Sequence, residues 1–499
     1  MSVVIHWFRR DLRLADNTAL NAAFQTGKPV VAVFVLSEWK SQHHWCGAAR
    51  QEFLCSCLAS LAAEIEAWGG RLIFRTGVAD VVLEELVAEC KADAIFYNRD
   101  PDPFGCVMEA RVEKMAAGVG VRAMGFKDHV MHEKNEVLTG KGTPFKVYTP
   151  YAKAWSRLPK NAPENVRGEF AQTKISTLSL PTLKTWSLKS TLAEPLAGGE
   201  TAAQKRLARF LDGRIQAYNE KRDFAAVEGT SRLSQDLRFG TLSIREVFQK
   251  CQQLLGKTKD AGGRLGIATY VKELIWREFS FSILGHWPGV LEHEFQEQYR
   301  TLPWKARWRP EDKSAWSREP DSKVDFDRWC AGLTGFPIVD AGMRELNATG
   351  FMHNRVRMIV AMFLTKDLHI WWMHGESYFM QHLVDGEIAS NNNGWQWSAS
   401  TGTDAAPYFR IQNPWAQTAR FDGDGEYIKR WVPELRDMAP KSFCEPPFPG
   451  TSLAKGYPPP MVDHREQRDA TISLFKNAAL GATTARTMKV PKQLFFGER

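Results

Sequence analysis

The sequence predicts an α/β fold in which a doubly wound parallel-sheet domain over residues 1–130 precedes a larger all-helical domain over residues 201–478. Three observations lead to this prediction. Short apolar runs alternate with amphipathic helical stretches in the N-terminal part, as in a parallel sheet with helices on both faces. From Pro159 to Gly199 the composition shifts to Pro, Ser, Thr, Leu and Lys without a sustained period. From Ala202 to about Leu435 helical periodicity dominates.

The apolar runs are the predicted strands, and they span Val3 to Phe8, Val30 to Leu36, Arg71 to Phe74 and Ala94 to Tyr97. Between the second and third strands, residues 50–68 carry apolar side chains at helical spacing and stop at Gly69-Gly70, which can cap a helix C-terminus. The turn after the first strand is charged and lacks the GxGxxG of dinucleotide-binding loops. The domain is therefore expected to be Rossmann-like in its winding without binding NAD.

The two remaining segments are expected to be an interdomain connection and a C-terminal tail. Residues 131–200 are predicted to be an interdomain connection that crosses the surface. Residues 479–499 are short, basic and irregular, and they predict a loosely docked tail.

Composition narrows the class of protein. The 499 residues contain no run of 18 or more apolar residues, and the N-terminus does not resemble a signal peptide, so a cytoplasmic protein that spans no membrane is expected. The eight cysteines form no CxxC pair, which predicts reduced thiols and no metal site. The net charge of +8 suits an anionic partner, but it suits a basic soluble enzyme equally well.

Tryptophan is concentrated in the helical half, where 12 of the 18 tryptophans lie between Trp276 and Trp431. These rings can fill a helical core, and they can also stack on bases or carry electrons. Glycine-rich segments occur in the same half, at residues 228–234 and 394–402. Their amides and hydroxyls suit phosphate groups, although ordinary helix capping by Thr230, Ser231 and Ser234 explains the first segment equally well.

Read together, several segments resemble the photolyase and cryptochrome family, in the family's own order. The matching segments are Trp7 to Asn17, Glu228 to Ser234, Thr334 to Arg344, Asp385 to Trp397, Thr401 to Asp404 and Arg410 to Pro414. The resemblance spans the chain from Ser2 to about Lys476. Within this family the chain is most similar to class I-like photolyases, which repair cyclobutane pyrimidine dimers in DNA.

The resemblance implies an FAD held in a U shape inside the helical domain, with the reduced, anionic flavin as its working form. The family's contacts supply hydroxyl and amide donors for the diphosphate and a carboxylate for the ring. The matching positions are Tyr218, Thr230, Ser231, Leu233, Ser234, Arg277, Arg357, Asp385, Glu387 and Asn391. Arg357 and Asp385 are expected to form a buried ion pair, whereas an ordinary surface pair contributes only about 0–1 kcal/mol.

Two of these positions are informative in themselves. Asn391 matches the residue that faces the flavin nitrogen protonated on reduction, and an amide there favours repair, whereas similar plant cryptochromes have aspartate. Glu387 stands where the family usually carries aspartate, which implies a modestly altered flavin site. Without the resemblance, the three consecutive asparagines could simply shape a turn.

The lesion is expected to be flipped out of the duplex, because a buried flavin cannot reach a base inside the stack. By resemblance, Glu273 accepts a hydrogen bond from a thymine edge, and Trp276 and Trp397 stack on the lesion. Met358 stands where enzymes for the 6-4 photoproduct place a second histidine, which implies the cyclobutane substrate. The remaining contacts to DNA implied by the resemblance are Arg222, Asn354, Arg355 and Arg410.

The family's electron chain matches Trp395 nearest the flavin, then Trp372, then a more exposed tryptophan. The region from Lys305 to Arg328 is longer than in the family, so the third member is Trp316 or Trp304, with Trp316 preferred.

The resemblance also implies a second, light-harvesting chromophore in the sheet domain, either a deazaflavin or methenyltetrahydrofolate. His43 or His44 and Glu109 lie near folate-contacting positions, and Asp102 to Gly105 resembles the deazaflavin-type loop. Neither match is complete, so the identity of this chromophore and its presence stay open.

Three functions compete: a repair enzyme, a cryptochrome photoreceptor of the same fold, and a DNA-binding module without catalysis. The flavin-contact positions argue against the third, and only about twenty residues beyond the family core argue against a signalling tail. We expect a monomeric, prokaryote-like photolyase that binds damaged DNA of any sequence, associates with the nucleoid through that DNA, and binds no membrane.

Overall fold

A computed structural model describes residues 2–40, 45–405 and 407–488. The described residues form two compact units. Unit 1 is drawn from Met1–Pro288, Arg344–Arg355 and Ser377–Asn392, and unit 2 from Gly289–Met343, Val356–Glu376 and Asn393–Arg499. The chain therefore leaves and re-enters each unit more than once.

Unit 1 contains one five-stranded parallel sheet. Its strands are β1 (Val3–Phe8), β2 (Val30–Leu36), β3 (Leu72–Thr76), β4 (Ala92–Asn98) and β5 (Arg122–Phe126). They follow the order β3-β2-β1-β4-β5, so the winding reverses between β1 and β4. The predicted doubly wound parallel sheet is confirmed.

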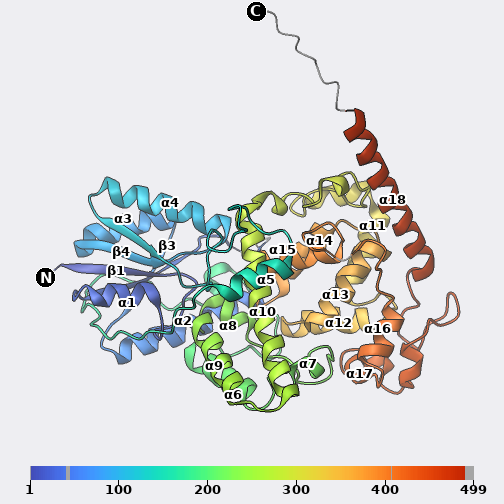
Figure 1. The fold of residues 1–499 in the computed structure, drawn as a ribbon, viewed down its shortest axis with the longest axis horizontal. Helices are drawn as coiled ribbons and strands as arrows, with labels where there is room; N and C mark the ends of the chain where they lie inside the picture. The colour runs from blue at the N-terminus through green and yellow to red at the C-terminus, as the bar shows by residue number, and fades with distance from the viewer. Residues whose placement is uncertain (1, 41–44, 406, 489–499) are drawn as a thin grey trace, which may run out of the picture. The chain divides into compact units, whose positions relative to one another are not determined.

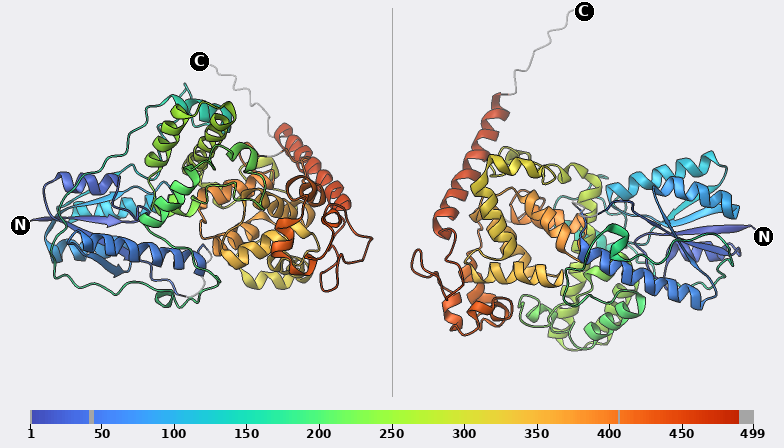
Figure 2. Two further views of the ribbon diagram at one scale, coloured as in Figure 1. Left: turned by 90° about the horizontal axis from the view of Figure 1, so that it is seen from below. Right: turned by 180° about the vertical axis from the view of Figure 1, so that it is seen from behind.

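Helices cover both faces of this sheet. Alternate side chains explain the arrangement, since Val4 and Phe8 of β1 pack on one face while Ile5 and Trp7 pack on the other. The first face is covered by α1 (Thr18–Gln25) and α2 (Ala48–Ala67), and the second by α3 (Ala79–Cys90) and α4 (Pro103–Gly118) (Figure 1). Figure 2 shows this layering of unit 1 from two further directions.

The helical part of unit 1 has its own apolar core, built around residues such as Phe210, Tyr270 and Phe279. Its helices are α5 (Tyr148–Arg157), α6 (Glu200–Leu211), α7 (Tyr218–Lys221), α8 (Ser234–Phe239), α9 (Ile244–Lys257) and α10 (Ala261–His286). Residues 159–199 contain only the 3₁₀ turn η1 (Leu183–Trp186) and one bridge to β2, at Phe170. Residues 159–199 therefore have little regular structure, whereas α5 lies within the first part of the connection expected over residues 131–200.

Outside the sheet, the described chain from residue 289 onward forms helices and loops. The helices are α11 (Pro320–Ala331), α12 (Pro337–Thr349), α13 (Asn354–Met362), α14 (Trp372–His382), α15 (Ile388–Ser398), α16 (Pro414–Phe421), α17 (Glu426–Trp431) and α18 (His464–Met488). The short turns are η2 (Pro288–Leu291), η3 (Glu297–Tyr299), η4 (Lys313–Arg318), the π-helical η5 (Phe363–Asp367), η6 (Pro433–Leu435) and η7 (Pro440–Phe443). No described helix is long and apolar enough to cross a membrane.

One expectation about the C-terminus was wrong. Residues 479–488 were expected to be irregular, but α18 continues through them to Met488. The sequence from Asn477 is rich in alanine, the best helix former, and contains a single glycine. Residues 489–499 of the predicted tail lie outside the described residues.

Candidate functional site

The glycine-rich segment 228–234 meets the segment that begins at Asp385 in unit 1. Leu233 is fully buried, and Ser234 begins α8. The Ser234 hydroxyl donates a 2.6 Å hydrogen bond to Oδ2 of Asp385, 151 residues later in the chain. Two segments that were predicted to contact the flavin are therefore adjacent. Thr230 and Ser231 are half-buried just before α8.

Tyr218, another predicted flavin contact, is buried at the start of α7. Its ring packs edge-on against Phe210 and Tyr270, with centroids 5.9 and 5.4 Å away. Burial raises the pKa of Tyr218, so the phenol stays neutral. It can therefore act as a hydrogen-bond donor at the edge of this cluster.

Glu387 is buried within a charged network. One carboxylate oxygen pairs with Arg10 and lies 3.6 Å from Nε2 of His129. Burial alone would raise the pKa of Glu387, but Arg10 and His129 hold it well below its usual range, and the carboxylate is ionised. Its other oxygen, Oε1, is buried without a hydrogen-bond partner among the described residues.

Arg10 follows β1 and joins this network to the sheet. Besides Glu387, it pairs with Asp100 at 2.8 Å and with Asp102 at 3.4 Å. Burial, followed by the charges of Arg10 and Arg277, lowers the pKa of His129 to about 3, so the imidazole is neutral. Arg277, predicted to contact the flavin, donates to the His129 carbonyl at 2.9 Å and to the Leu237 carbonyl at 3.2 Å.

Two further arginines fix the backbone of the segment 380–387. Arg50, which is 2% exposed, donates to the carbonyls of Met380 and, at 3.1 Å, of Leu383. Arg238 donates to the Gly386 carbonyl at 2.8 Å. These bonds hold Asp385 and Glu387 in place independently of any ligand.

One observation indicates that the residues of unit 1 can hold a flavin dinucleotide: Oε1 of Glu387 is buried and has no hydrogen-bond partner among the described residues. A buried oxygen left unpaired costs about 1–3 kcal/mol, more when it is charged, and a donor on a bound ligand would remove that cost at Glu387 Oε1. The hydroxyls of Thr230, Ser231 and Ser234 add donors of the kind that a diphosphate requires. FAD, when bound here, would supply electron-transfer chemistry.

The other flavin contacts can be placed only in part. Asn391 is half-buried in the first turn of α15, and its backbone N–H donates to the Glu387 backbone carbonyl at 2.8 Å. Arg357 is half-buried on α13 in unit 2. Its pairing with Asp385, which belongs to unit 1, stays a prediction.

The predicted lesion contacts of unit 1 include two ion pairs. Arg222 pairs with Glu273, and Arg355 pairs with Asp223 at 2.8 Å. Burial raises the pKa of Glu273 above its usual range, an effect that Arg222 opposes. Asn354 is exposed at the start of α13. These arginines are therefore oriented by carboxylates before any phosphate arrives.

Trp276 on α10 is half-buried, and one face of its indole is already covered. The ring of Tyr148 stacks on it with a centroid distance of 3.7 Å and an interplanar angle of 4°. The Tyr148 hydroxyl donates to the Lys272 carbonyl at 2.9 Å, which fixes the tyrosine against α10. Trp276 is thus held rigid by a residue that sequence reasoning missed.

Unit 2 contains the predicted electron chain. Trp395, Trp372 and Trp316 are 2%, 0% and 8% exposed. The alternative third member, Trp304, is 8% exposed, and its indole N–H donates to Glu294 at 2.9 Å. The predicted lesion contacts of this unit are half-buried Met358 and Trp397 and exposed Arg410.

Four residues contact predicted site residues without having been assigned from the sequence: Arg10, His129, Tyr148 and Asp223. Arg10 lies in the Trp7 to Asn17 motif, so its position carried a signal, but its partner Glu387 is 377 residues away. No feature of the sequence near Tyr148 indicates a stacking partner for Trp276.

The described side chains that were expected to contact a second chromophore make ion pairs and hydrogen bonds within the protein instead. Glu109 pairs with Arg9 and accepts from the Asp100 amide at 2.6 Å. Asp102 caps α4 by accepting from the Gly105 amide at 2.7 Å. His43 and His44 lie outside the described residues.

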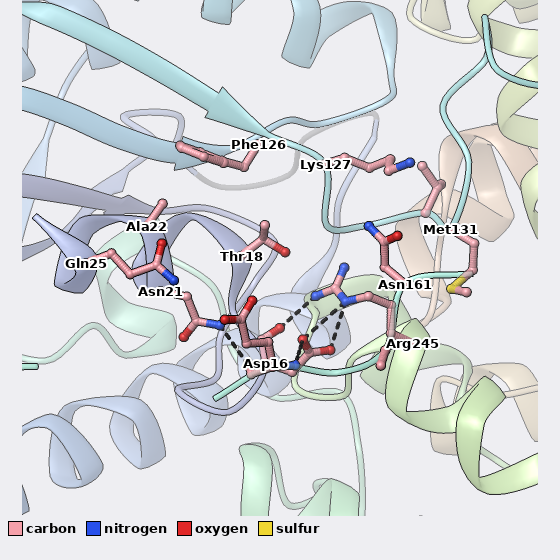
Figure 3. A pocket seen from close by; sticks show the side chains of 13 residues that line it. Asp16, Thr18, Asn21, Ala22, Gln25, Phe126, Lys127, Met131, Asn161 and Arg245 are labelled. Carbon is pink, nitrogen blue, oxygen red and sulfur yellow. Dashed lines mark hydrogen bonds and ion pairs between the residues drawn. The ribbon is translucent and has the colours of Figure 1, made fainter. Parts of the chain in front are cut away.

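A separate pocket of about 400 Å³ opens in unit 1 beside α1, the end of β5 and Arg245 (Figure 3). The Arg245 guanidinium in its wall is already paired: Nε donates to Asp16 Oδ2 at 3.0 Å, and Nη2 donates to Asp128 at 2.7 Å. None of the predicted flavin or lesion residues lines this pocket.

Family models match two parts of the chain. Residues 4–167 match the model described as DNA photolyase, and residues 270–477 match the FAD binding domain of DNA photolyase. The chain is 37% identical over 492 residues to the deoxyribodipyrimidine photo-lyase of Escherichia coli, covering 96% of this chain and 100% of that protein. It is 37% identical over 471 residues to the Synechococcus enzyme of the same name, covering 92% and 94% of the two chains.

Solved structures show the same relationship. A class III photolyase from Agrobacterium tumefaciens has a TM-score of 0.85 at 35% identity, covering 96% of this chain and 98% of that chain. An archaeal photolyase from Sulfolobus tokodaii, solved with two FAD molecules, has a TM-score of 0.80 at 32% identity, covering 95% and 99%. A cryptochrome from Synechocystis has a TM-score of 0.83 at 26% identity, covering 95% and 99%. On its sequence, its fold and its FAD-binding domain, the chain belongs to the DNA photolyase family.

Proposed function

We propose that this protein is a light-driven deoxyribodipyrimidine photo-lyase that repairs cyclobutane pyrimidine dimers in DNA. The observation that carries the proposal is the 37% identity to the Escherichia coli photo-lyase across 96% of one chain and 100% of the other. The alignment runs along nearly the whole of both chains, and the family models for both the photolyase domain and its FAD-binding domain match this chain.

The residues around the proposed flavin site have separate roles. Ser234, Asp385, Glu387 and Asn391 bind the FAD, and Arg10 keeps Glu387 ionised. Reduced FAD, when bound, supplies the electron that opens the cyclobutane ring and takes an electron back afterwards. The protein contributes position and exclusion of water, because the flavin-contact residues Asp385 and Glu387 are each only 7% exposed.

The lesion is recognised by residues that are rigid before DNA binds. Tyr148 leaves one face of Trp276 for stacking on the flipped dimer, a contact worth about 1–3 kcal/mol per base. Glu273 accepts from a thymine edge, and its ion pair with Arg222 fixes the carboxylate. Trp397 and Met358 are the proposed lesion contacts that unit 2 contributes.

A second candidate function is that of a blue-light photoreceptor. It is favoured by the TM-score of 0.83 with the Synechocystis cryptochrome, although the identity to that protein is 26%, against 37% for the photo-lyases. Both functions use the same fold and cofactor, so only an assay of DNA repair separates them.

We further propose that the protein acts as a monomer in the cytoplasm, since one lesion needs one active site. Its net charge of +8 and the exposed Arg410 favour contacts to DNA phosphates, which carry little sequence information.

The test is the loss of cyclobutane dimers from an irradiated oligonucleotide incubated with purified, chemically reduced protein under blue light. A dark sample and a 6-4 photoproduct substrate are the controls. Loss of cyclobutane dimers only in the light supports the proposal. No repair by protein that carries its full content of FAD would favour the photoreceptor instead.

A further inference from the structure

The tryptophans of the predicted electron chain expose little of their surface to solution. Trp395, Trp372 and Trp316 are at most 8% exposed, and so is Trp304. A better exposed ring in contact with the chain would therefore give a dissolved electron donor easier access.

The ring contacts of unit 2 lead from Trp395 to Trp316. Trp395 lies 6.1 Å from Trp329, centroid to centroid, and Trp329 lies 5.7 Å from Phe326. Phe326 stacks on Trp316 at 5.2 Å. A second series of contacts reaches Trp316 from Trp372 through Trp371 and His374, with steps of 6.3, 6.4 and 4.7 Å. Both series converge on Trp316.

Beyond Trp316 the next ring is Trp308. The two indoles lie 5.3 Å apart at 85°, and Trp308 is half-buried where Trp316 is buried. Trp304, in contrast, has its described ring contact with Phe475 at 6.3 Å. Trp304 and Trp371 both donate their indole N–H to Oε1 of Glu294, at 2.9 and 3.0 Å, so Trp304 is linked to the cluster by a carboxylate. Among the described residues, the ring contacts of Trp316 continue to the surface at Trp308 and not to Trp304.

The segment that carries Trp308 is held firmly against the rest of the cluster. The backbone of Lys305 forms an isolated parallel β-bridge with that of Ile370, the residue before Trp371. The Ala306 amide donates to Glu319 at 2.9 Å, and the Ala306 carbonyl lies 2.7 Å from Nε2 of His374. Trp308 is thus fixed by the same segment that places Trp371 and His374.

Charge favours an electron vacancy at Trp308 over one at Trp316. A positive ring is costly where water is excluded, and Trp308 is the more hydrated of the two. Lys323 lies 5.9 Å from the Trp316 ring and opposes a second positive charge there, although Asp327 partly balances it. Burial lowers the pKa of His374 to about 4, so the imidazole between the rings adds no positive charge.

The arginines beside Trp308 have acidic partners of their own. Arg307 pairs with Glu294 at 3.3 Å, and Arg309 pairs with Glu292 at 3.9 Å. Each of these two arginines therefore has its charge balanced by a partner of its own.

We propose that Trp308 is the terminal tryptophan of the photoreduction chain, where an external one-electron donor such as a thiol returns an electron to the protein. This inference rests on the proposed function, because it concerns how oxidised flavin is returned to its working form. In each light-driven turn Trp395 gives one electron to the excited flavin, and the vacancy moves to Trp316 and then to Trp308. Two such turns supply the two electrons that separate oxidised flavin from its reduced working form. A thiolate gives one electron to the Trp308 radical cation and becomes a thiyl radical. The indole N–H of Trp308 is buried without an acceptor among the described residues, so the ring keeps its proton meanwhile.

The test locates the vacancy by mass spectrometry. Protein with oxidised FAD is illuminated in air without added thiol, and oxidised tryptophan is mapped by peptide. We expect oxidation at Trp308, its loss in Trp316→Phe, and slower photoreduction with thiol in Trp308→Phe. Trp287 is the matched control, because it is half-buried but lies in unit 1 outside the cluster, so Trp287→Phe should photoreduce at the wild-type rate.

Oxidation of Trp308 that persists in Trp316→Phe, or equal oxidation of Trp308 and Trp287, would show attack from solution and overturn the proposal. Wild-type photoreduction in Trp308→Phe would also overturn it. Repair by chemically reduced wild-type protein is measured alongside, because it needs no photoreduction and reveals a failure of the proposed function separately.

Discussion

Single contacts around the lesion residues make sharp predictions, and the first concerns Tyr148. Its ring supports Trp276 at 3.7 Å, so Tyr148→Ala should leave Trp276 mobile. An aromatic pair is worth about 0.5–1.5 kcal/mol, and the Kd for dimer-containing DNA should rise roughly 2- to 10-fold. Fluorescence anisotropy in the dark measures this. Tyr148→Phe keeps the stacked ring and should bind like wild type; equal binding by all three proteins would remove the role assigned to Tyr148.

Glu387 makes a prediction about pH. Its pKa is lowered in the folded protein, so its ion pair stabilises the fold above the ordinary value of 4.5 and loses that effect as pH falls below it. Glu387→Gln should lower the free energy of unfolding by about 3 kcal/mol at pH 7, because Arg10 loses a buried partner. Denaturant unfolding from pH 7 to pH 3 should show the difference between variant and wild type shrinking. A difference that is independent of pH would mean that Glu387 is not ionised in the fold.

At the residue scale, sequence reasoning reached some of these contacts and not others. Ser234 and Asp385 were both assigned to the flavin from their motifs, and they meet in the structure. The pairing of Arg10 with Glu387 could not be foreseen, because Arg10 had no predicted role and a motif carries no information about distant partners. Tyr148 lies in a segment without any motif, and only its position reveals its function.

Among the helices, the packing of α14 makes a prediction at Gly375. A Cβ at this position would lie 2.1 Å from the Trp395 ring, so the glycine lets the indole lie against the helix backbone. Gly375→Ala should cost about 1–3 kcal/mol of stability. Gly394→Ala is the matched control, since this exposed helical glycine has no atom within 4 Å, and it should gain about 0.5–1 kcal/mol. Equal thermal unfolding of the two variants would contradict this packing.

The strands show what periodicity can and cannot reveal about elements. The ranges predicted for β1 and β2 agree with the structure, because apolar runs, interrupted only by His6 in β1, mark strands buried on both faces. β5 was missed because Arg122 and Gly125 interrupt its short apolar pattern at the edge of the sheet. The helix over residues 479–488 was missed because its basic composition was read without regard to its alanines.

For the whole molecule, the excess of positive charge predicts binding to damaged DNA that weakens with salt. Arg410 is exposed, so Arg410→Gln should remove one phosphate contact and lower the slope of log K against log salt by about 0.9. Arg465, exposed on α18 and outside the predicted lesion contacts, is the control. Titrations at several salt concentrations measure both slopes. An unchanged slope in Arg410→Gln, or equal losses in both variants, would argue against Arg410 as a phosphate contact.

Because unit 1 is built from segments far apart in the chain, some of its contacts can form only late in synthesis. Arg10 emerges from the ribosome 377 residues before Glu387, which at usual translation speeds is roughly 20 to 75 seconds. During that interval Arg10 and Arg50 have not yet met Glu387, Met380 and Leu383, their partners in the finished protein. The nascent sheet must therefore stay soluble with its future interior arginines uncovered, and their charge helps to keep it from aggregating until the last segment of unit 1 arrives.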